Sequence, residues 1–157
     1  DNNFNGDLIG TWEISAMDGY VELKFYDTAS GYWTPKLAKR GQRFTFYSDS
    51  TFRTTGLDWW SDYTISGERN GEMFEDSLDL GGHLGLGTFS YNPINHHLKT
   101  TYLVDQISDT FRYEYSLTKL SNNELKYVIL YDSTWAYMPP AWYTQFGEVT
   151  HTFEKVQ

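Results

Sequence analysis

The stretch Phe111-Arg-Tyr-Glu-Tyr-Ser-Leu-Thr118 decides the fold class, because apolar and polar residues alternate through it without a break. Successive side chains of a β-strand point to opposite faces, so one face of this segment is apolar and the other is polar. Ser121-Asn-Asn123 follows with residues typical of turns. Residues 125–131 then carry Leu, Tyr, Ile and Tyr at every second position. This pattern predicts an antiparallel hairpin.

The same period of two recurs on both sides of this hairpin. Further strands are predicted over residues 8–16, 42–47, 51–55, 62–67, 87–91, 98–104 and 148–156. No segment keeps apolar residues at steps of three and four for more than about a turn, so little helix is expected. Eight to ten short antiparallel strands in hairpin order indicate a sandwich or an up-and-down β-barrel. The barrel is favoured, because closure removes exposed strand edges.

The length and the cysteine content limit the number of domains and the kinds of site that the chain can form. With 157 residues, the chain fits one domain. We expect a flexible lead over residues 1–7 and a single barrel domain over residues 8–157, since no repeat or linker divides the rest. The absence of cysteine excludes disulfides, thiol nucleophiles, zinc ribbons and iron–sulfur clusters.

The net charge of the chain limits which classes of binding partner are expected. Lys and Arg number 12 against 21 Asp and Glu, a net charge of −9. Nucleic-acid binding needs a basic footprint, so no nucleic-acid partner is expected. Docking on anionic lipid is disfavoured as well. Contact with a membrane is expected only through a lipid anchor on a segment before Asp1.

The opening strand resembles a known family. Gly10-Thr11-Trp12 resembles the Gly-x-Trp opening of lipocalins. The hairpins 44–52 and 115–125 and the closing residues 152–156 follow in the order of bacterial lipocalin-like domains, many of which are exported lipoproteins. The resemblance implies a calycin-type barrel, with Trp12 plugging its base. It also implies export to the periplasm or outer-membrane surface of a bacterium.

Two features depart from the lipocalin pattern. Eukaryotic lipocalins pair the signature Trp with an Arg on or after the last strand, where this chain has only Lys155. The Thr-Asp-Tyr motif of eukaryotic lipocalins is also missing. The resemblance therefore implies the fold and no particular ligand.

Residues with catalytic or metal-binding chemistry follow no recognised spacing. The four histidines, interpreted as surface or turn residues, are His83, His96, His97 and His151. They lack the spacings of a metal site, and the acidic residues between Glu68 and Asp79 lack the spacing of a calcium loop. No Gly-x-Ser-x-Gly elbow is present. We therefore expect no catalytic residue, no metal and no cofactor, and a hydrolase built from carboxylates or His is the least favoured hypothesis.

Aromatic residues, with 10 Phe, 6 Trp and 13 Tyr, are the most informative feature. Ten of them fall on predicted inward faces, namely Phe44, Phe46, Phe52, Phe89, Tyr91, Tyr102, Tyr113, Tyr115, Tyr127 and Phe153. Others fall in three predicted connections, around residues 31–35 and 57–62 and in a long loop over 133–147. These are expected to edge a barrel mouth and bind a ligand: Trp33, Trp59, Trp60, Trp135, Tyr137, Trp142 and Tyr143.

Two functions are compatible with this distribution of rings. The first is a non-enzymatic, lipocalin-like exported protein that binds a small, largely apolar ligand at an aromatic barrel mouth. The second is an interaction module whose barrel is filled by side chains and whose exposed aromatics bind a protein or a glycan. An eight-stranded barrel is wide enough either to be filled or to hold one small ligand, so both stay open. The sequence predicts no oligomeric state.

Overall fold

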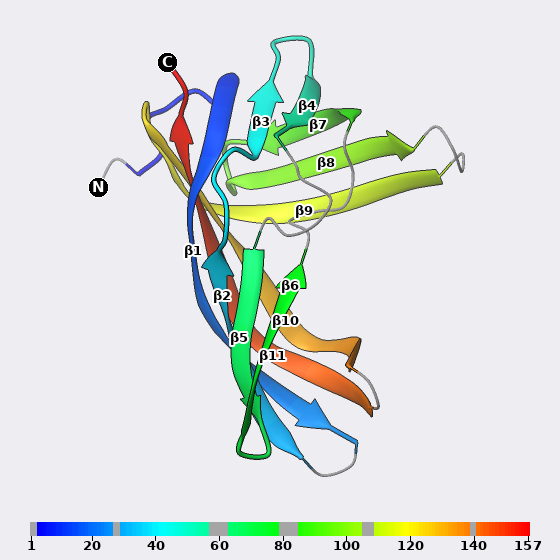
Figure 1. The fold of residues 1–157 in the computed structure, drawn as a ribbon. Coiled ribbons are helices and arrows are strands. Elements are labelled where there is room, and N and C mark those ends of the chain that lie inside the picture. Colours follow the sequence, from blue (N-terminus) through cyan, green and yellow to red (C-terminus); the bar gives the residue numbers. More distant parts are fainter. Residues whose placement is uncertain (1–2, 27–28, 57–62, 79–84, 105–108, 139–140) are drawn as a thin grey trace.

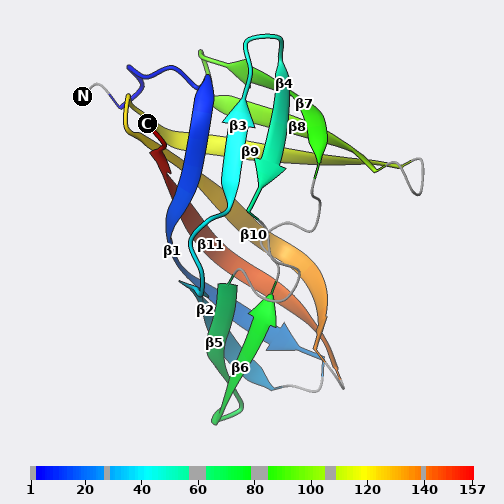
Figure 2. The same cartoon turned by 45° about the horizontal axis from the view of Figure 1, so that its top comes forward.

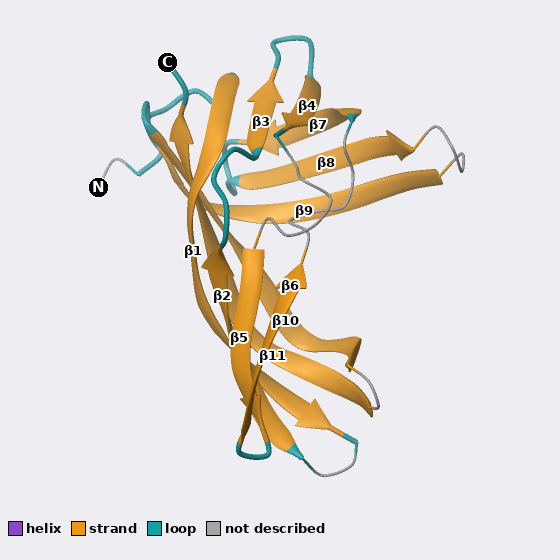
Figure 3. Cartoon of the chain, viewed as in Figure 1, coloured by secondary structure: helices purple, strands orange, loops and turns teal. Residues whose placement is uncertain are grey.

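The described residues form strands and turns. The computed structural model describes residues 3–26, 29–56, 63–78, 85–104, 109–138 and 141–157. In these ranges it holds eleven strands and no helix, hence no helix able to span a membrane (Figure 3). The strands are β1 (Gly10–Phe25), β2 (Ser30–Leu37), β3 (Arg43–Phe46), β4 (Thr51–Thr55), β5 (Tyr63–Arg69), β6 (Glu72–Leu78), β7 (Leu86–Asn92), β8 (His97–Val104), β9 (Asp109–Leu120), β10 (Glu124–Met138) and β11 (Ala141–Lys155).

Eight of these strands close an antiparallel barrel. The order is β1-β3-β4-β7-β8-β9-β10-β11, and β11 pairs back onto β1. Apart from the excursions through β2 and through β5 and β6, each barrel strand lies beside the next one in the chain. The predicted all-β, up-and-down barrel with little helix is therefore confirmed.

The other three strands continue the same sheet from β1 and lie below the barrel (Figures 1 and 2). β1 is long enough to pair with β3 through residues 10–13 and with β2 through residues 21–24. β5 pairs with β2, and β6 pairs with β5. We call this part the extension: β2, β5, β6 and residues 20–25 of β1, 129–138 of β10 and 141–148 of β11. Its inner face is continuous with the barrel interior.

β9 and β10 separate where the barrel meets the extension. They pair only between residues 116–120 and 125–128, and beyond this point they run in different directions (Figure 1). Register shifts at Ser15 in β1 and at Ser133 in β10 mark bulges, which bend a strand and increase its twist. We call the gap between residues 109–115 of β9 and 129–138 of β10 the seam.

Aromatic rings fill much of the barrel. Of the ten rings predicted to point inward, six are buried: Phe44, Phe46, Phe52, Tyr102, Tyr127 and Phe153. The other four are partly buried and pack against the same core: Phe89, Tyr91, Tyr113 and Tyr115. Neighbouring rings in this set have centroids 4.5–6.3 Å apart, as in Tyr115–Tyr127 and Tyr113–Tyr115. The period of two had therefore identified the inner faces.

Trp12 lies at the start of β1 and has no exposed surface. Its indole Nε1–H donates to the backbone oxygen of Leu8 over 2.8 Å. The Lys155 ammonium lies 4.9 Å from the centroid of the ring and donates to the backbone oxygen of Asp7. Lys155 thus makes a cation–π contact with Trp12, at the end of the chain where the lipocalin pattern has an Arg.

Part of the N-terminal lead is bonded to the barrel. Leu120 accepts a backbone hydrogen bond from Gly6 and donates one to Asn3. The Phe4 ring stacks on His96 with centroids 3.4 Å apart. Residues 3–6 therefore have fixed partners, and flexibility of residues 1–7 as a whole stays a prediction.

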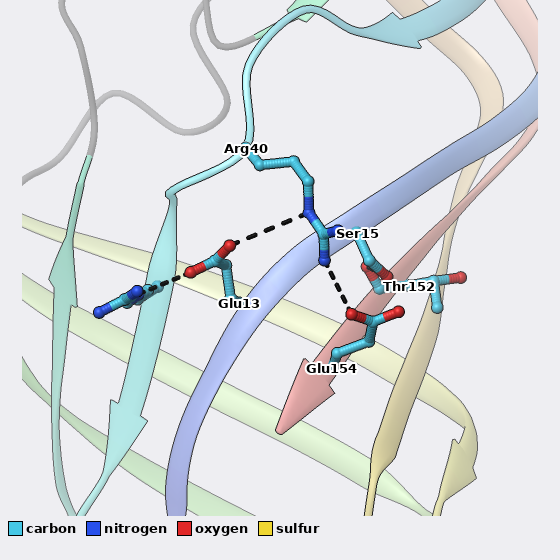
Figure 4. A network of polar contacts seen from close by, with 6 residues as sticks. Glu13, Ser15, Arg40, Thr152 and Glu154 are labelled. Atoms are coloured by element: carbon cyan, nitrogen blue, oxygen red, sulfur yellow. Dashed lines mark hydrogen bonds and ion pairs between the residues drawn. The ribbon is translucent and has the colours of Figure 1, made fainter. Parts of the chain in front are cut away.

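A group of ion pairs ties the segment before β3 to the barrel wall (Figure 4). Arg40 lies 2.8 Å from Glu154 of β11 and 3.9 Å from Glu13 of β1, and Arg43 lies 2.8 Å from the same Glu13. Ser15, at the bulge, donates to the backbone oxygen of Thr152. The ion pairs are partly exposed, so each contributes about 0–1 kcal/mol. They position the chain where β1 passes from β3 to β2.

Two predicted connections are strands in the structure. The predicted long loop over residues 133–147 is wrong: β10 and β11 remain paired from Thr134 opposite Gln145 to Met138 opposite Ala141. The connection around Trp33 is also wrong, since it is β2. Proline has no backbone N–H to donate to a neighbouring strand. Pro35 is tolerated because it pairs with β5 on one side only, since the pairing of β2 with β1 ends at Trp33.

Candidate functional site

Four neighbouring strands each place one inner-face position in a row across the extension. Val21 of β1 pairs with Trp33 of β2 on one side and with Gly147 of β11 on the other, and Gly147 pairs with Tyr131 of β10. The two ends of the row carry large rings. Of the two middle positions, Val21 has a small side chain and Gly147 has none. The Trp33 and Tyr131 rings meet edge to face, with centroids 5.6 Å apart.

Gln145 lies on the same face, two residues before Gly147. The Trp33 Nε1–H donates to its side-chain oxygen over 2.9 Å, and both residues are buried. This hydrogen bond joins β2 to β11 across β1. It fixes the indole ring and the amide relative to each other.

Tyr143 lies on the same face, near the start of β11. The Tyr143 ring packs against the Phe25 ring with centroids 5.2 Å apart. The Arg69 guanidinium lies over the Phe25 ring, 4.1 Å from its centroid. Burial, and secondarily the negative charge of Asp76 on β6, raise the pKa of the Tyr143 hydroxyl. Burial raises the pKa of Tyr131 as well. We call Trp33, Tyr131, Tyr143 and Gln145 the seam site.

Gly147 lets β11 approach the backbone of β1 closely in this row, and a substitution there tests this. A Cβ on Gly147 would lie 2.2 Å from the backbone oxygen of Tyr20, and the φ of 144° is one that L-residues rarely adopt. We expect Gly147→Ala to lower the free energy of unfolding by about 2 kcal/mol in urea denaturation. Gly85→Ala is the matched control, because no atom lies within 4 Å of its added Cβ. Equal stabilities of the two variants would contradict this assignment.

The seven predicted ligand residues do not form one rim. Trp33 and Tyr143 lie buried on the inner face, while Trp135 and Trp142 are more than half exposed on the outer face. The backbone of Tyr137 belongs to β10, and its side chain lies outside the described residues. Trp59 and Trp60 also lie outside the described residues. Side chains alternate between faces along β10 and β11, so a run of aromatics there divides between them.

The outer face carries a separate aromatic cluster. Tyr26 and Trp135 have ring centroids 5.2 Å apart, and the backbone oxygen of Trp142 accepts a hydrogen bond from Tyr26. We call Tyr26, Trp135 and Trp142 the outer cluster. All three are over half exposed. Exposed apolar surface of this kind is a feature of interaction sites.

Sequence reasoning missed Tyr131 and Gln145 of the seam site. Tyr131 was predicted to end a strand, and Gln145 fell in the predicted loop. An inner-face signal does exist, because the buried Tyr143, Gln145 and Val149 lie at even spacings along β11, with half-buried or exposed residues beside them. Gln145 and Gly147 interrupt this pattern in the sequence, because neither residue type is typical of a hydrophobic core.

His151 corrects one prediction about the histidines. It is buried on the inner face of β11, with only 6% of its surface exposed, so its interpretation as a surface or turn residue is wrong. Its Nδ1 and the Tyr127 hydroxyl share a hydrogen bond of 3.2 Å. Burial lowers the pKa of His151 to about 4, so the ring is neutral near pH 7. The signal available was its position in the alternation between Val149 and Phe153.

The described residues bring no metal-binding group together. Among them, no three His, Asp or Glu side chains lie close enough to hold a metal ion. His96 faces Phe4, and His97 lies 3.7 Å from Glu114. His83 lies outside the described ranges.

Comparison with known proteins adds no family to this geometry. No family model, curated protein or solved structure matches this chain. The closed antiparallel barrel is the architecture that the lipocalin resemblance implies. The arrangement of the seam site must therefore be interpreted from its own chemistry: aromatic rings, one amide and two phenolic hydroxyls beside a gap in strand pairing.

Proposed function

We propose that this protein is a non-enzymatic, lipocalin-like binding protein that holds a small, largely apolar, ring-shaped ligand at the seam site. The observation that carries the proposal is the edge-to-face meeting of the Trp33 and Tyr131 rings, beside the seam. Sites for small molecules are lined mainly by aromatic and apolar side chains with a few polar groups. On the resemblance alone, we also propose export to the periplasm or outer-membrane surface of a bacterium.

The position of Tyr131 supports binding from the seam. It lies three residues beyond Val128, where the pairing of β10 with β9 ends. On the other side of the seam, Tyr113 and Tyr115 are only partly buried. A planar ligand between these rings would gain stacking and burial of apolar surface.

Titration with N-phenyl-1-naphthylamine, a neutral apolar fluorophore, tests this proposal. We expect saturable fluorescence enhancement with one site per chain. Tyr131→Ala removes one of the two rings that meet edge to face and is expected to weaken binding roughly tenfold. Trp135→Ala is the matched control, since it removes a ring from the same strand on the opposite face.

Three outcomes separate the hypotheses. Saturable binding that is weakened by Tyr131→Ala and unaffected by Trp135→Ala supports the seam site. Absence of saturable binding to the unaltered protein overturns the proposal. Weakening by Trp135→Ala alone moves the site to the outer face.

The outer cluster favours a second candidate function, an interaction module. Trp and Tyr are the residues most enriched at the energetic centres of protein interfaces. Trp135 lies in β10, Trp142 in the adjacent β11, and Tyr26 directly follows β1, the next strand; all three are over half exposed. In this function the barrel would be a scaffold, and the outer cluster would contact a protein or a glycan.

A further inference from the structure

The hydrogen bond between Trp33 and Gln145 determines which atoms of the amide remain available. An indole N–H can only donate, so the atom of Gln145 facing it must be the carbonyl oxygen. The amide NH2 group is therefore directed elsewhere. Among the described residues it has no hydrogen-bond partner, although Gln145 is 92% buried with 8% of its surface exposed.

The two phenolic hydroxyls of the seam site are in the same situation. In the described part of the chain, neither the Tyr131 nor the Tyr143 hydroxyl has a hydrogen-bond partner. Among the described residues, Thr100 Oγ1 is the side-chain polar atom that is fully enclosed and has no partner. The Gln145 amide nitrogen and the Tyr131 and Tyr143 hydroxyls are not enclosed in this way, so each keeps some accessible surface. Buried donors are costly to leave unpaired, and a bound molecule that reaches them can pair them.

The charges around this face offset one another. Arg69 lies over the Phe25 ring, and Asp76 acts on the neighbouring Tyr143. Neither sign dominates beside the site, and the whole chain carries a net charge of −9. An anionic ligand would gain little here and would meet the overall negative field.

We infer that the ligand of the seam site is an uncharged, planar aromatic molecule that carries hydrogen-bond acceptor oxygens, of the aryl ketone class. The rings of Trp33 and Tyr131 contact its flat faces or edges, while the Gln145 amide and the Tyr131 and Tyr143 hydroxyls donate to its oxygens. This inference rests on the proposed function and adds the chemistry of the ligand. It differs from binding of an aliphatic chain, which would leave all three donors unpaired.

Two probes of similar shape test it: flavone, which has a ring oxygen and a ketone, and 2-phenylnaphthalene, which has neither. Equilibrium dialysis gives the affinity of each for the unaltered protein and for the double variant Tyr131→Phe/Tyr143→Phe. The double variant removes two hydroxyls and keeps both rings. We expect it to weaken flavone binding roughly three- to tenfold and to leave 2-phenylnaphthalene binding unchanged or slightly stronger. Tyr20→Phe, on the outer face and half exposed, is the matched control and should change neither.

The outcomes distinguish this inference from the proposed function. If both probes bind and the double variant changes neither affinity, the acceptor chemistry is overturned while ligand binding at the seam site stands. If neither probe nor N-phenyl-1-naphthylamine binds, both proposals fail. If Tyr20→Phe weakens flavone binding as much as the double variant does, the donors of the seam site are not responsible, and the inference is wrong.

Discussion

Replacing Trp12 by alanine is expected to lower the free energy of unfolding by about 3–5 kcal/mol. Trp12 has no exposed surface, and it combines a hydrogen bond to Leu8 with the cation–π contact of Lys155. It stands where β1 pairs with both β3 and β11, opposite Phe44 and Lys155. Its removal leaves a cavity between three strands. Urea unfolding followed by circular dichroism measures the change.

Two further variants assign this loss to its components. Trp12→Phe keeps an aromatic ring and removes the hydrogen bond to the Leu8 oxygen, so an intermediate loss is expected. Lys155→Met removes the charge and is expected to cost about 1 kcal/mol or less, the range of a partly exposed cation–π contact. A loss below 1 kcal/mol for Trp12→Ala would show that the base of the barrel does not depend on this residue.

Local patterns predicted the barrel hairpins well, and the reason is physical. In β3–β4, β7–β8 and β9–β10 the strand period and the turn residues lie within about twenty residues of each other. Ser50 and His96 adopt positive φ in two of these turns, where polar or short side chains are common. Each hairpin is thus specified by residues close in sequence.

Of the three added strands of the extension only β5 was predicted, as a strand over residues 62–67, because the pairing partners of this part are far apart in sequence. β2 contains Gly31 and Pro35, which both disfavour strands in isolation, and its position depends on β1 continuing past residue 16. The bulge at Ser133 shifts the alternation of β10 by one residue, so the apolar face is lost to a period-of-two reading. Residues 133–147 were therefore predicted as a long loop between the last two strands.

The seam site was only half predicted for the same reason. Trp33 and Tyr143 stood out as aromatics outside the predicted core, and both lie in the site. Their partners Gln145 and Gly147 matter through register: Val21 must pair with Trp33 on one edge and with Gly147 on the other. A register across four strands is a property of the whole sheet, and no local pattern contains it.

Acidification is expected to destabilise the fold through His151. Burial lowers its pKa in the folded protein to about 4, against about 6.5 for an unperturbed histidine. Above pH 6.5 the ring is neutral in both states, and the full stability is present. Between pH 6.5 and 4 the unfolded chain binds a proton that the folded protein does not, so the free energy of unfolding falls. The total loss is about 3 kcal/mol, and below pH 4 this contribution is constant.

The variant His151→Gln isolates this contribution from the carboxylates that titrate in the same range. Glutamine can still hydrogen-bond to the Tyr127 hydroxyl but takes up no proton. Urea unfolding at intervals between pH 7 and 4 should therefore show a shallower pH dependence for this variant, and the difference between the two curves should grow to about 3 kcal/mol by pH 4. In the unaltered protein, the ring resonances of His151 should titrate with a midpoint near pH 4 by NMR. Parallel unfolding curves, or a midpoint near 6.5, would mean that the imidazole is solvated and that its burial beside Tyr127 does not shape the stability of the barrel.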